Sequence, residues 1–351
     1  MEQDNHQKYN RPTIKDLASE LNTSSSTISR ALRGHHTISD AMIQKVRDLA
    51  KLRNYSVNRS AANLRSGSSM TLGVIVPRIN RDFFSNCIAG IEEIAKSAGY
   101  SVLISQSHDN ILDESEIIKT MIEGNVSAVL ISVAIKTSNV KHIEQLDKVG
   151  IPVVFFDRAM DDSKYCKVVI DDLKGAYLAT KHLLDMGYKR IAHFAGDMNL
   201  MIYENRMAGY EKALKEYGVK IDPTIISTNT LTFENGQEQI KQFMQLKKAP
   251  DALFAASDFS ALGALIYLKS IGTNIPKDFG VVGFSNETFT SFVSPNMSTV
   301  NQHSLDIGRN AAKVCLNILE SPSKFNMINH VIIEPTLIVR ESSQRIVLNN
   351  K

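Results

Sequence analysis

Cysteine is scarce in this chain, and the three cysteines, Cys87, Cys166 and Cys315, lie far apart. They form no C-x-x-C pair and have no accompanying histidine cluster, which argues against a disulfide framework and against a zinc site. The histidines form no H-E-x-x-H pattern either, so we expect no metal and no cofactor. The thiols are expected to be free and buried, in a reducing compartment.

Long apolar runs are missing as well. The first residues, MEQDNHQKYNRP, contain no apolar core of a signal peptide, and no stretch of the chain approaches the length that spans a membrane. We therefore expect a cytoplasmic protein without a membrane partner.

The usual signatures of nucleotide-binding and hydrolytic enzymes are absent too. The segment 77–84, PRINRDFF, follows the first apolar strand of the body and contains neither G-x-G-x-x-G nor the glycine–lysine pair of a P-loop. The segment 283–287, GFSNE, is superficially similar to the G-x-S-x-G nucleophile elbow, but it lacks the second glycine. These absences indicate that the chain is not an enzyme.

What the sequence does have is an uneven distribution of charge. Residues 1–69 carry 11 Lys and Arg against 6 Asp and Glu, whereas the remaining residues carry 29 against 31. A basic head on a nearly neutral body predicts a polyanionic partner for the head alone, because phosphate neutralisation supplies most non-specific DNA affinity. The alternative, a merely solvated surface, is not excluded by charge alone.

The basic head begins with a pattern of two short helices. Thr13 and Asp16 form a capping box that opens the first, and a second is predicted to start near Ser25 after a polar turn. Small polar side chains and one arginine are left on the outside of the second helix, where they could hydrogen-bond to base edges in a DNA groove. A plain amphipathic helix pair is the alternative interpretation.

A third helix is predicted from Ser39, as cap, through about Asn54, with Leu52 among its inward residues. Residues 55–65 then form a short helix-capable run with two arginines, and the polar stretch 66–69 ends the head. The predicted domains are a helix-turn-helix domain at 1–57, a hinge helix and linker at 58–69, and a core at 70–351.

The order of these motifs closely resembles the amino-terminal region of the lactose-repressor (LacI) family of bacterial regulators. The family pattern T-x-x-D-[LIV]-A is matched at 13–18, T-[IV]-S-R at 27–30, Y-x-x-N at 55–58 and A-x-x-L at 61–64. The resemblance continues to about residue 340. It implies a multidomain protein with an all-α DNA-binding head and an α/β core like a periplasmic binding protein.

Each DNA-contacting residue of the family maps onto a position of this chain. By resemblance, Ser25, Ser26 and Arg30 read bases, while Thr27, Ser29 and Asn58 contact the DNA backbone. Leu64 is implied to wedge into the minor groove at the centre of a pseudo-palindromic operator, helped by Arg59 and Arg65. The alternative role for Leu64 is the core of a short helix. Val57 departs from the family, which usually has proline there.

The body alternates short apolar runs with amphipathic ones from Thr71 onward, which predicts two doubly wound α/β halves with parallel sheets. We assign 70–165 with 300–322 to the first half and 166–299 with 323–351 to the second. Two such halves predict a crevice at the carboxyl ends of their strands, where sheets of this kind bind small ligands.

Six residues match the effector-contact motifs of the family. They are Phe83, Phe84, Asp157, Arg206, Ser257 and Asp258. A pairing with Arg158 is the alternative for Asp157, a buried salt bridge is the alternative for Arg206, and helix N-capping is the alternative for Ser257 and Asp258.

Two departures from the family surround this predicted site. Asp82 replaces the proline of an N-P-F-F segment and could cap the following helix. Ser285-Asn286 stands where Gly-[FY]-Asp-Asp is common, so one carboxylate contact is absent.

The resemblance implies a repressor that binds double-stranded DNA as a homodimer, possibly a tetramer, under the control of a small-molecule effector. A sugar or sugar derivative is the family-level expectation for the effector, with purine-like ligands next. Two rival functions stay open at this point: a small-molecule-binding module with a protein-interacting head, and a hydrolase with a regulatory head.

Overall fold

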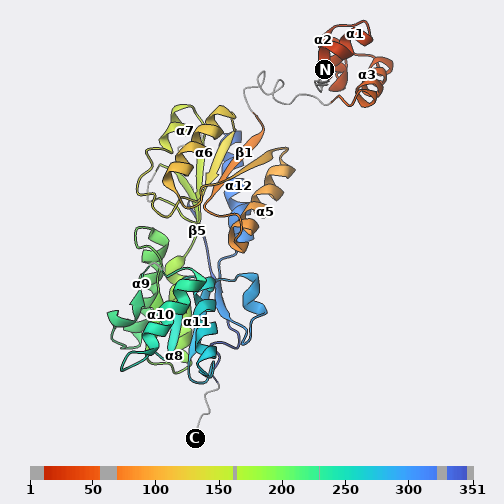
Figure 1. Cartoon of the computed structure of the whole chain (residues 1–351). Coiled ribbons are helices and arrows are strands. Elements are labelled where there is room, and N and C mark those ends of the chain that lie inside the picture. The colour runs from red at the N-terminus through yellow and green to blue at the C-terminus, as the bar shows by residue number, and fades with distance from the viewer. Residues whose placement is uncertain (1–11, 56–68, 161–163, 229, 322–329, 346–351) are drawn as a thin grey trace, which may run out of the picture. The chain divides into compact units, whose positions relative to one another are not determined.

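The computed structural model describes residues 12–55, 69–160, 164–228, 230–321 and 330–345 (Figure 1). The chain divides into two compact units, Met1–Ser69 and Met70–Lys351, which we call the head and the core. The combination of an all-α head with an α/β core confirms the predicted fold class. None of the helices in the described ranges is both long enough and apolar enough to cross a membrane.

The head consists of α1 (Ile14–Glu20), α2 (Ser25–Leu32) and α3 (Asp40–Leu52). The predicted capping box at the start of α1 is present, with the side chain of Thr13 accepting from the backbone N–H of Asp16. The buried apolar centre of the head comprises Leu17, Ala18, Ile28, Ala31, Val46 and Ala50.

The prediction that Leu52 points inward is wrong, because its side chain is 77% exposed. Val46 and Ala50 lie four residues apart on the buried face of α3, and at 100° per residue Leu52 falls on the opposite side of the helix. An apolar residue near a helix end therefore does not by itself extend the buried face.

The first subdomain of the core is built on a six-stranded sheet in the order β11-β5-β4-β3-β1-β2, with every neighbouring pair parallel. Val74 of β1 pairs with Ile104 on one side and with Leu130 on the other. The strands are β1 (Thr71–Val76), β2 (Ser101–Gln106), β3 (Ala128–Ile131), β4 (Val153–Phe156), β5 (Cys166–Ile170) and β11 (His330–Ile333).

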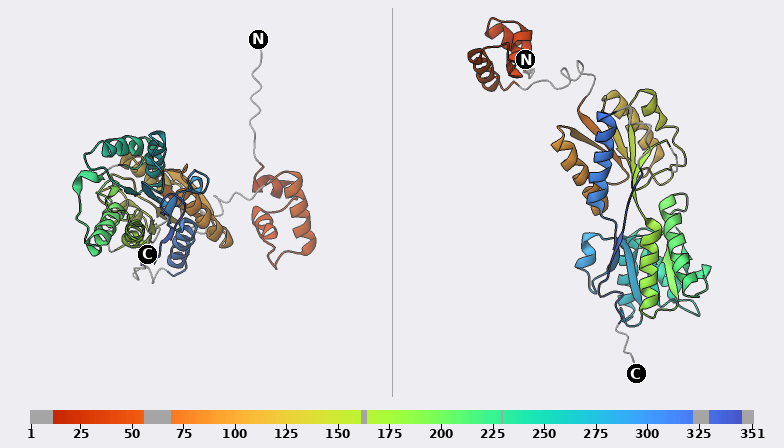
Figure 2. Two further views of the ribbon diagram at one scale, coloured as in Figure 1. Left: turned by 90° about the horizontal axis from the view of Figure 1, so that it is seen from below. Right: turned by 180° about the vertical axis from the view of Figure 1, so that it is seen from behind.

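Helices cover both faces of this first sheet. Along β1, Leu72, Val74 and Val76 pack toward α5 (Asp82–Ser97) and α12 (Ser304–Glu320). Ile75 points to the other face, toward α6 (Ile111–Glu123), because successive side chains of a strand alternate. The short α7 (Glu144–Lys148) lies beside α6, and Figure 2 shows α5 and α12 side by side.

The second subdomain contains a sheet in the order β12-β10-β9-β8-β6-β7, in which only the β10–β12 pair is antiparallel. The strands are β6 (Ile191–Phe194), β7 (Ile226–Ser227), β8 (Ala252–Ala255), β9 (Gly280–Ser285), β10 (Ser298–Asn301) and β12 (Thr336–Ile338). The helices are α8 (Asp172–Asp185), α9 (Met201–Glu216), α10 (Phe233–Met244) and α11 (Asp258–Ser270), with the short 3-10 turns η1 (Pro223–Ile225) and η2 (Thr288–Ser291). Neither β7 nor α10 was predicted from the sequence.

The chain crosses between the two subdomains at three places. It leaves the first sheet at Asp171, returns at Gln302-His303, and crosses again at Glu334-Pro335. The first and third crossings run side by side, since the backbone N–H of Asp171 donates to the carbonyl of Ile333 at 3.1 Å.

These crossings differ from the predicted division of the core at three strands. We had assigned β5 and β11 to the second half, but they pair with each other in the first sheet, whereas β10 reaches Asn301 in the second. An apolar strand carries the same pattern in either sheet, so its pairing partner is decided by tertiary contacts and not by periodicity.

Candidate DNA-binding head and effector site

Helix α2 presents the residues that the resemblance assigns to DNA contacts. Ser26 and Arg30 are exposed, while Ser25, Thr27 and Ser29 are half-buried. Two of the three residues predicted to read bases therefore lie on an exposed helix face, as a groove contact requires.

The start of α2 is organised by its N-cap residue, Ser24. Its hydroxyl accepts from the backbone N–H of Thr27 at 3.1 Å and lies 2.7 Å from the hydroxyl oxygen of Ser26. A hydrogen bond of 2.9 Å also joins the hydroxyls of Ser24 and Thr27. This N-cap holds the first-turn hydroxyls in one arrangement before any partner binds.

Arg30 takes part in no ion pair among residues 12–55 of the head. Arg53, by contrast, pairs with Glu20. An unpaired exposed guanidinium is free to make the bidentate contact that recognises guanine or phosphate. The predicted contacts Asn58, Arg59, Leu64 and Arg65 lie outside the described residues, so their roles stay predictions.

In the core, Asp157 follows β4 directly, with a backbone φ of +58°. The hydroxyl of Ser132, which follows β3, donates to its Oδ2 at 3.1 Å. Burial raises the pKa of Asp157, although the positive charges of Arg158 and Arg206 oppose the rise. Arg158 forms its ion pair with Asp109 and not with Asp157, so the structure does not show the alternative pairing that the sequence analysis considered.

Arg206 of α9 is 4% exposed, and each of its guanidinium nitrogens has a partner. Nε donates to Asp172 at 2.8 Å, Nη1 to the carbonyl of Ala256 at 2.9 Å, and Nη2 to Gln302 at 3.4 Å. Its central carbon lies 3.8 Å from the centre of the Phe284 ring. The buried salt bridge, named above as the alternative for Arg206, is therefore present.

The partners of Arg206 were missed by the sequence analysis. Asp172 is the first residue of α8, just after the first crossing, and Gln302 lies in the second crossing. Burial raises the pKa of Asp172 to about 6, despite the lowering effect of Arg206. Arg206 thus ties two crossing segments together. No local motif in the sequence indicates Asp172 and Gln302 as partners of Arg206, because they come close to it only in the folded chain.

Asp258 is also buried, and its carboxylate serves two neighbours. Oδ1 accepts from the hydroxyl of Thr299 at 2.6 Å, and Oδ2 accepts from the backbone N–H of Glu287 at 2.8 Å. Burial raises the pKa of Asp258 to about 7. Ser257 occupies the N-cap position of α11, but its hydroxyl donates to the carbonyl of Leu231 and makes no cap hydrogen bond.

Phe83 and Phe84 are both buried in the apolar core of the first subdomain, with their rings edge to face at 5.1 Å. The structure therefore shows a packing role for both rings. Their predicted contact with an effector stays a prediction.

The two residues that replace the common Asp-Asp pair are held by neighbouring side chains. Ser285 accepts from the side chain of Gln302 at 2.8 Å, and Asn286 accepts from Arg340 at 2.9 Å. Gln302 therefore links Arg206 to Ser285, which joins the predicted effector residues to the loop after β9.

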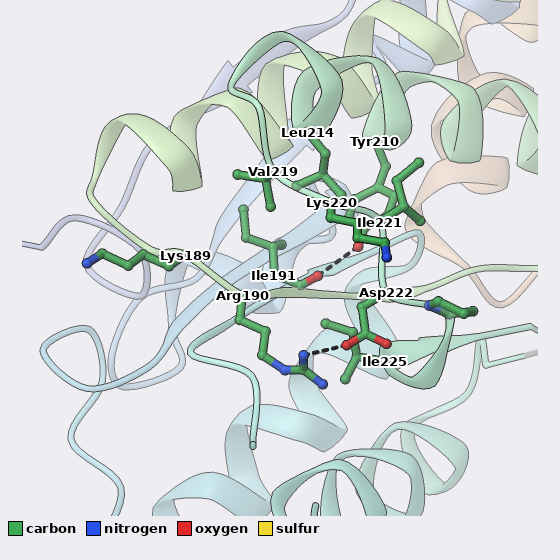
Figure 3. Close-up of a pocket in the computed structure, with 11 residues that line it drawn as sticks. Lys189, Arg190, Ile191, Tyr210, Leu214, Val219, Lys220, Ile221, Asp222 and Ile225 are labelled. Atoms are coloured by element: carbon green, nitrogen blue, oxygen red, sulfur yellow. Dashed lines mark hydrogen bonds and ion pairs between the residues drawn. The ribbon is translucent and has the colours of Figure 1, made fainter. Parts of the chain in front are cut away.

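A pocket of about 480 Å³ opens elsewhere, at the start of β6 (Figure 3). Arg190 pairs with Asp222 across it, and the hydroxyl of Tyr210 donates to the carbonyl of Ile191 at 2.8 Å. None of the sequence-predicted effector residues lines this pocket. The described residues contain no group of three or more His, Cys, Asp or Glu that could hold a metal ion.

Comparison with known proteins agrees with this two-part architecture. Residues 72–323 match the model of the periplasmic binding protein domain family. The chain is 31% identical to the HTH-type transcriptional regulator RegA of Clostridium saccharobutylicum over 334 residues, which is 94% of this chain and 99% of that protein. It is 32% identical to the HTH-type transcriptional repressor CytR of Escherichia coli K12 over 308 residues, 88% of this chain and 90% of that protein.

The fold is shared with the lac repressor dimer bound to operator and the anti-inducer ONPF, with a TM-score of 0.83 and 22% identity over 95% of this chain and 99% of that one. The helix-turn-helix head, the two-sheet core and the relatives that match nearly their whole length lead to one conclusion: the chain belongs to the lactose-repressor (LacI) family of DNA-binding transcriptional regulators.

Proposed function

We propose that this protein is a repressor that binds a pseudo-palindromic operator as a homodimer, with an affinity set by a small-molecule effector in the core. The observation that carries the proposal is the joining, in one chain, of a head with an exposed Arg30 to a two-subdomain ligand-binding fold. The relatives named above are regulators, which supports this function over a protein-interacting head. We assign the chain no enzymatic role, and place it in the cytoplasm at the bacterial nucleoid.

In the proposed complex, α2 lies in the major groove. Ser25, Ser26 and Arg30 contact base edges, with Arg30 on guanine, while Thr27, Ser29 and Asn58 contact the DNA backbone. Leu64 enters the minor groove between the half-sites, assisted by Arg59 and Arg65. The Ser24 cap supports this assignment because it orients the hydroxyls of Ser26 and Thr27 in advance.

The proposed effector is a sugar or sugar derivative held by Asp157 and Arg206, with Phe83, Phe84, Ser257 and Asp258 around it. Three of the five N–H donors of Arg206 are engaged, so an effector oxygen could accept from a second N–H of Nη1 or Nη2, or take the place of one of the three partners. The bond to Gln302, at 3.4 Å, is the longest and so the weakest of the three. A sugar hydroxyl that replaced Gln302 would also alter the second crossing between the subdomains, which gives a route from ligand to conformation.

Selection of duplexes from a randomised pool, followed by gel shifts at fixed ionic strength with and without a panel of sugars, tests this function. We expect one pseudo-palindromic duplex to be bound more tightly than random DNA, and at least one sugar to change that affinity. Product formation in the same tubes would reveal a hydrolase. A head that prefers no duplex with any sugar overturns the proposal.

A further inference from the structure

The first turn of α5 is capped from the other subdomain. Its N-cap residue, Arg81, makes no side-chain cap hydrogen bond. A helix start leaves backbone N–H groups without partners inside the helix, and these require an acceptor. Here the acceptor is Glu287, in the loop after β9, whose Oε2 accepts from the backbone N–H of Asp82 at 3.2 Å.

A second hydrogen bond joins the two subdomains, with its donor in the second and its acceptor in the first. The carboxylate of Asp82, through Oδ2, accepts from the backbone N–H of Thr288 at 2.9 Å. Thr288 is the first residue of η2, in the second subdomain. Two carboxylates therefore each bind a backbone N–H at the start of a helical segment in the opposite subdomain, where the local dipole favours negative charge.

A stacked cation adds a third contact beside these two. The guanidinium carbon of Arg81 lies 3.6 Å from the centre of the Phe259 ring, on α11 of the second subdomain. That ring packs edge to face against Phe289 at 5.0 Å. A guanidinium at this distance from a ring is attracted by the negative face of the ring.

Glu287 is held in place by hydrogen bonds within the second subdomain. Glu287 is only 5% exposed, and its backbone N–H donates to Asp258, which in turn accepts from Thr299 on β10. A pre-positioned acceptor loses little freedom when the contact forms, which strengthens the hydrogen bond.

Asp82 is the residue that makes the exchange possible. The common family pattern has proline here, which has no N–H to offer Glu287 and no carboxylate to offer Thr288. The departure at Asp82 therefore creates both hydrogen bonds.

We propose that Arg81, Asp82 and Glu287 form a clasp that joins the two subdomains of the core and opposes their separation. The clasp acts in addition to the three crossings of the chain. The regulatory consequence rests on the proposed function: an effector that enters an opened core must first break the clasp, so the clasp sets how readily the regulator responds.

The test measures closure directly and needs neither DNA nor effector. The native cysteines are buried, so Glu116→Cys on α6 and Lys241→Cys on α10, both exposed, allow dye labelling of the full chain. Distances between the dyes report the open and closed populations. We expect Asp82→Pro, which removes both charge-assisted hydrogen bonds, to raise the ratio of open to closed molecules about a hundredfold, or about tenfold for each bond lost.

Proline suits this position, because Asp82 is the first residue of α5 and Arg81 has an extended backbone, with φ of −126° and ψ of 132°. Thr288→Pro, at the first residue of η2, removes only the N–H that donates to Asp82. It should therefore raise the open population less than Asp82→Pro does. Ile111→Pro at the start of α6 and Asp113→Ala in its first turn are the matched controls, and should leave the distances unchanged. Unchanged distances in both Asp82→Pro and Thr288→Pro, with the helical circular dichroism preserved, overturn the clasp and leave the proposed function intact.

Discussion

In the head, Arg30 is exposed and has no ion-pair partner among residues 12–55, whereas in the core Arg206 is 4% exposed and each of its three guanidinium nitrogens donates to a partner. The charge of Arg30 is exposed to solvent, where a polyanion can bind it. The charges of Arg206 and Asp172 are buried in the core, where their ion pair joins the crossing segments. A basic residue of the head should therefore affect DNA binding without affecting stability, and removal of a buried charge of the core should lower stability.

The largest expected effect is on the stability of the core. Arg206→Ala leaves the carboxylate of Asp172 buried without its partner, which should lower the free energy of unfolding by about 3–5 kcal/mol. Urea unfolding of the full chain measures the loss. Because an apolar pair avoids the unpaired charge, Arg206→Met with Asp172→Leu should recover most of it; no recovery would contradict a stability role through this pair.

A second variant tests whether the head is a separate unit. Ile28 is fully buried at the centre of the head, so Ile28→Ala should destabilise it by about 2–5 kcal/mol. Hydrogen exchange should show loss of protection across residues 12–55 and none in the core. Simultaneous loss in both regions would mean that the two units unfold together.

Arg30→Ala should change DNA binding and not stability, whereas Arg206→Ala should lower stability. Arg30→Ala should weaken binding to the selected duplex by about 1–3 kcal/mol and leave the free energy of unfolding unchanged. Lys247→Ala removes an exposed charge from the core and serves as the control, with no expected effect on DNA affinity. Equal losses in the two variants would show that net charge alone drives binding.

The head and the core should also differ in the sign of their pH dependence. Burial raises the pKa of Asp258 from 3.8 to about 7, so the folded core holds a proton that the unfolded chain releases, and this contribution to stability is lost as the pH rises from about 4 to 7. Hydrogen bonds from Thr13 lower the pKa of Asp16, so its contribution in the head is present above pH 3.8 and is lost as the pH falls through the lowered value. The free energy of unfolding should be measured against pH for Asp258→Asn and Asp16→Asn. Asp258→Asn should remove a decrease of stability with rising pH between about 4 and 7, and Asp16→Asn should remove an increase of stability with rising pH below 3.8. Slopes of the same sign would contradict the contrast.

Much of the head could be predicted because its signals are local. The capping box of Thr13 and Asp16, the turn, and the start of α2 at Ser25 depend on contacts within one helical turn. The inward assignment of Leu52 failed because it rested on residue type and not on the face of α3.

The candidate effector site could be predicted only in part. Asp157 was predicted from its place after a strand and Arg206 from the family resemblance, but the partners of Arg206 are Asp172 and Gln302, which are far away in the sequence. The same holds for the contact of Asp82 with Thr288, across the two subdomains. No periodicity within a short window carries such information.

The amino-acid sequence by itself determined most of the helices and strands and the basic charge of the head, because these depend on local hydrogen bonding, alternation of apolar residues and net charge, and its motifs indicated the family. Only the tertiary structure decided to which sheet β5, β10 and β11 belong, and which buried carboxylate each arginine meets. The physical reason is that apolar strands are interchangeable in pattern and buried charges are satisfied by whichever partner the folded chain brings within hydrogen-bonding distance.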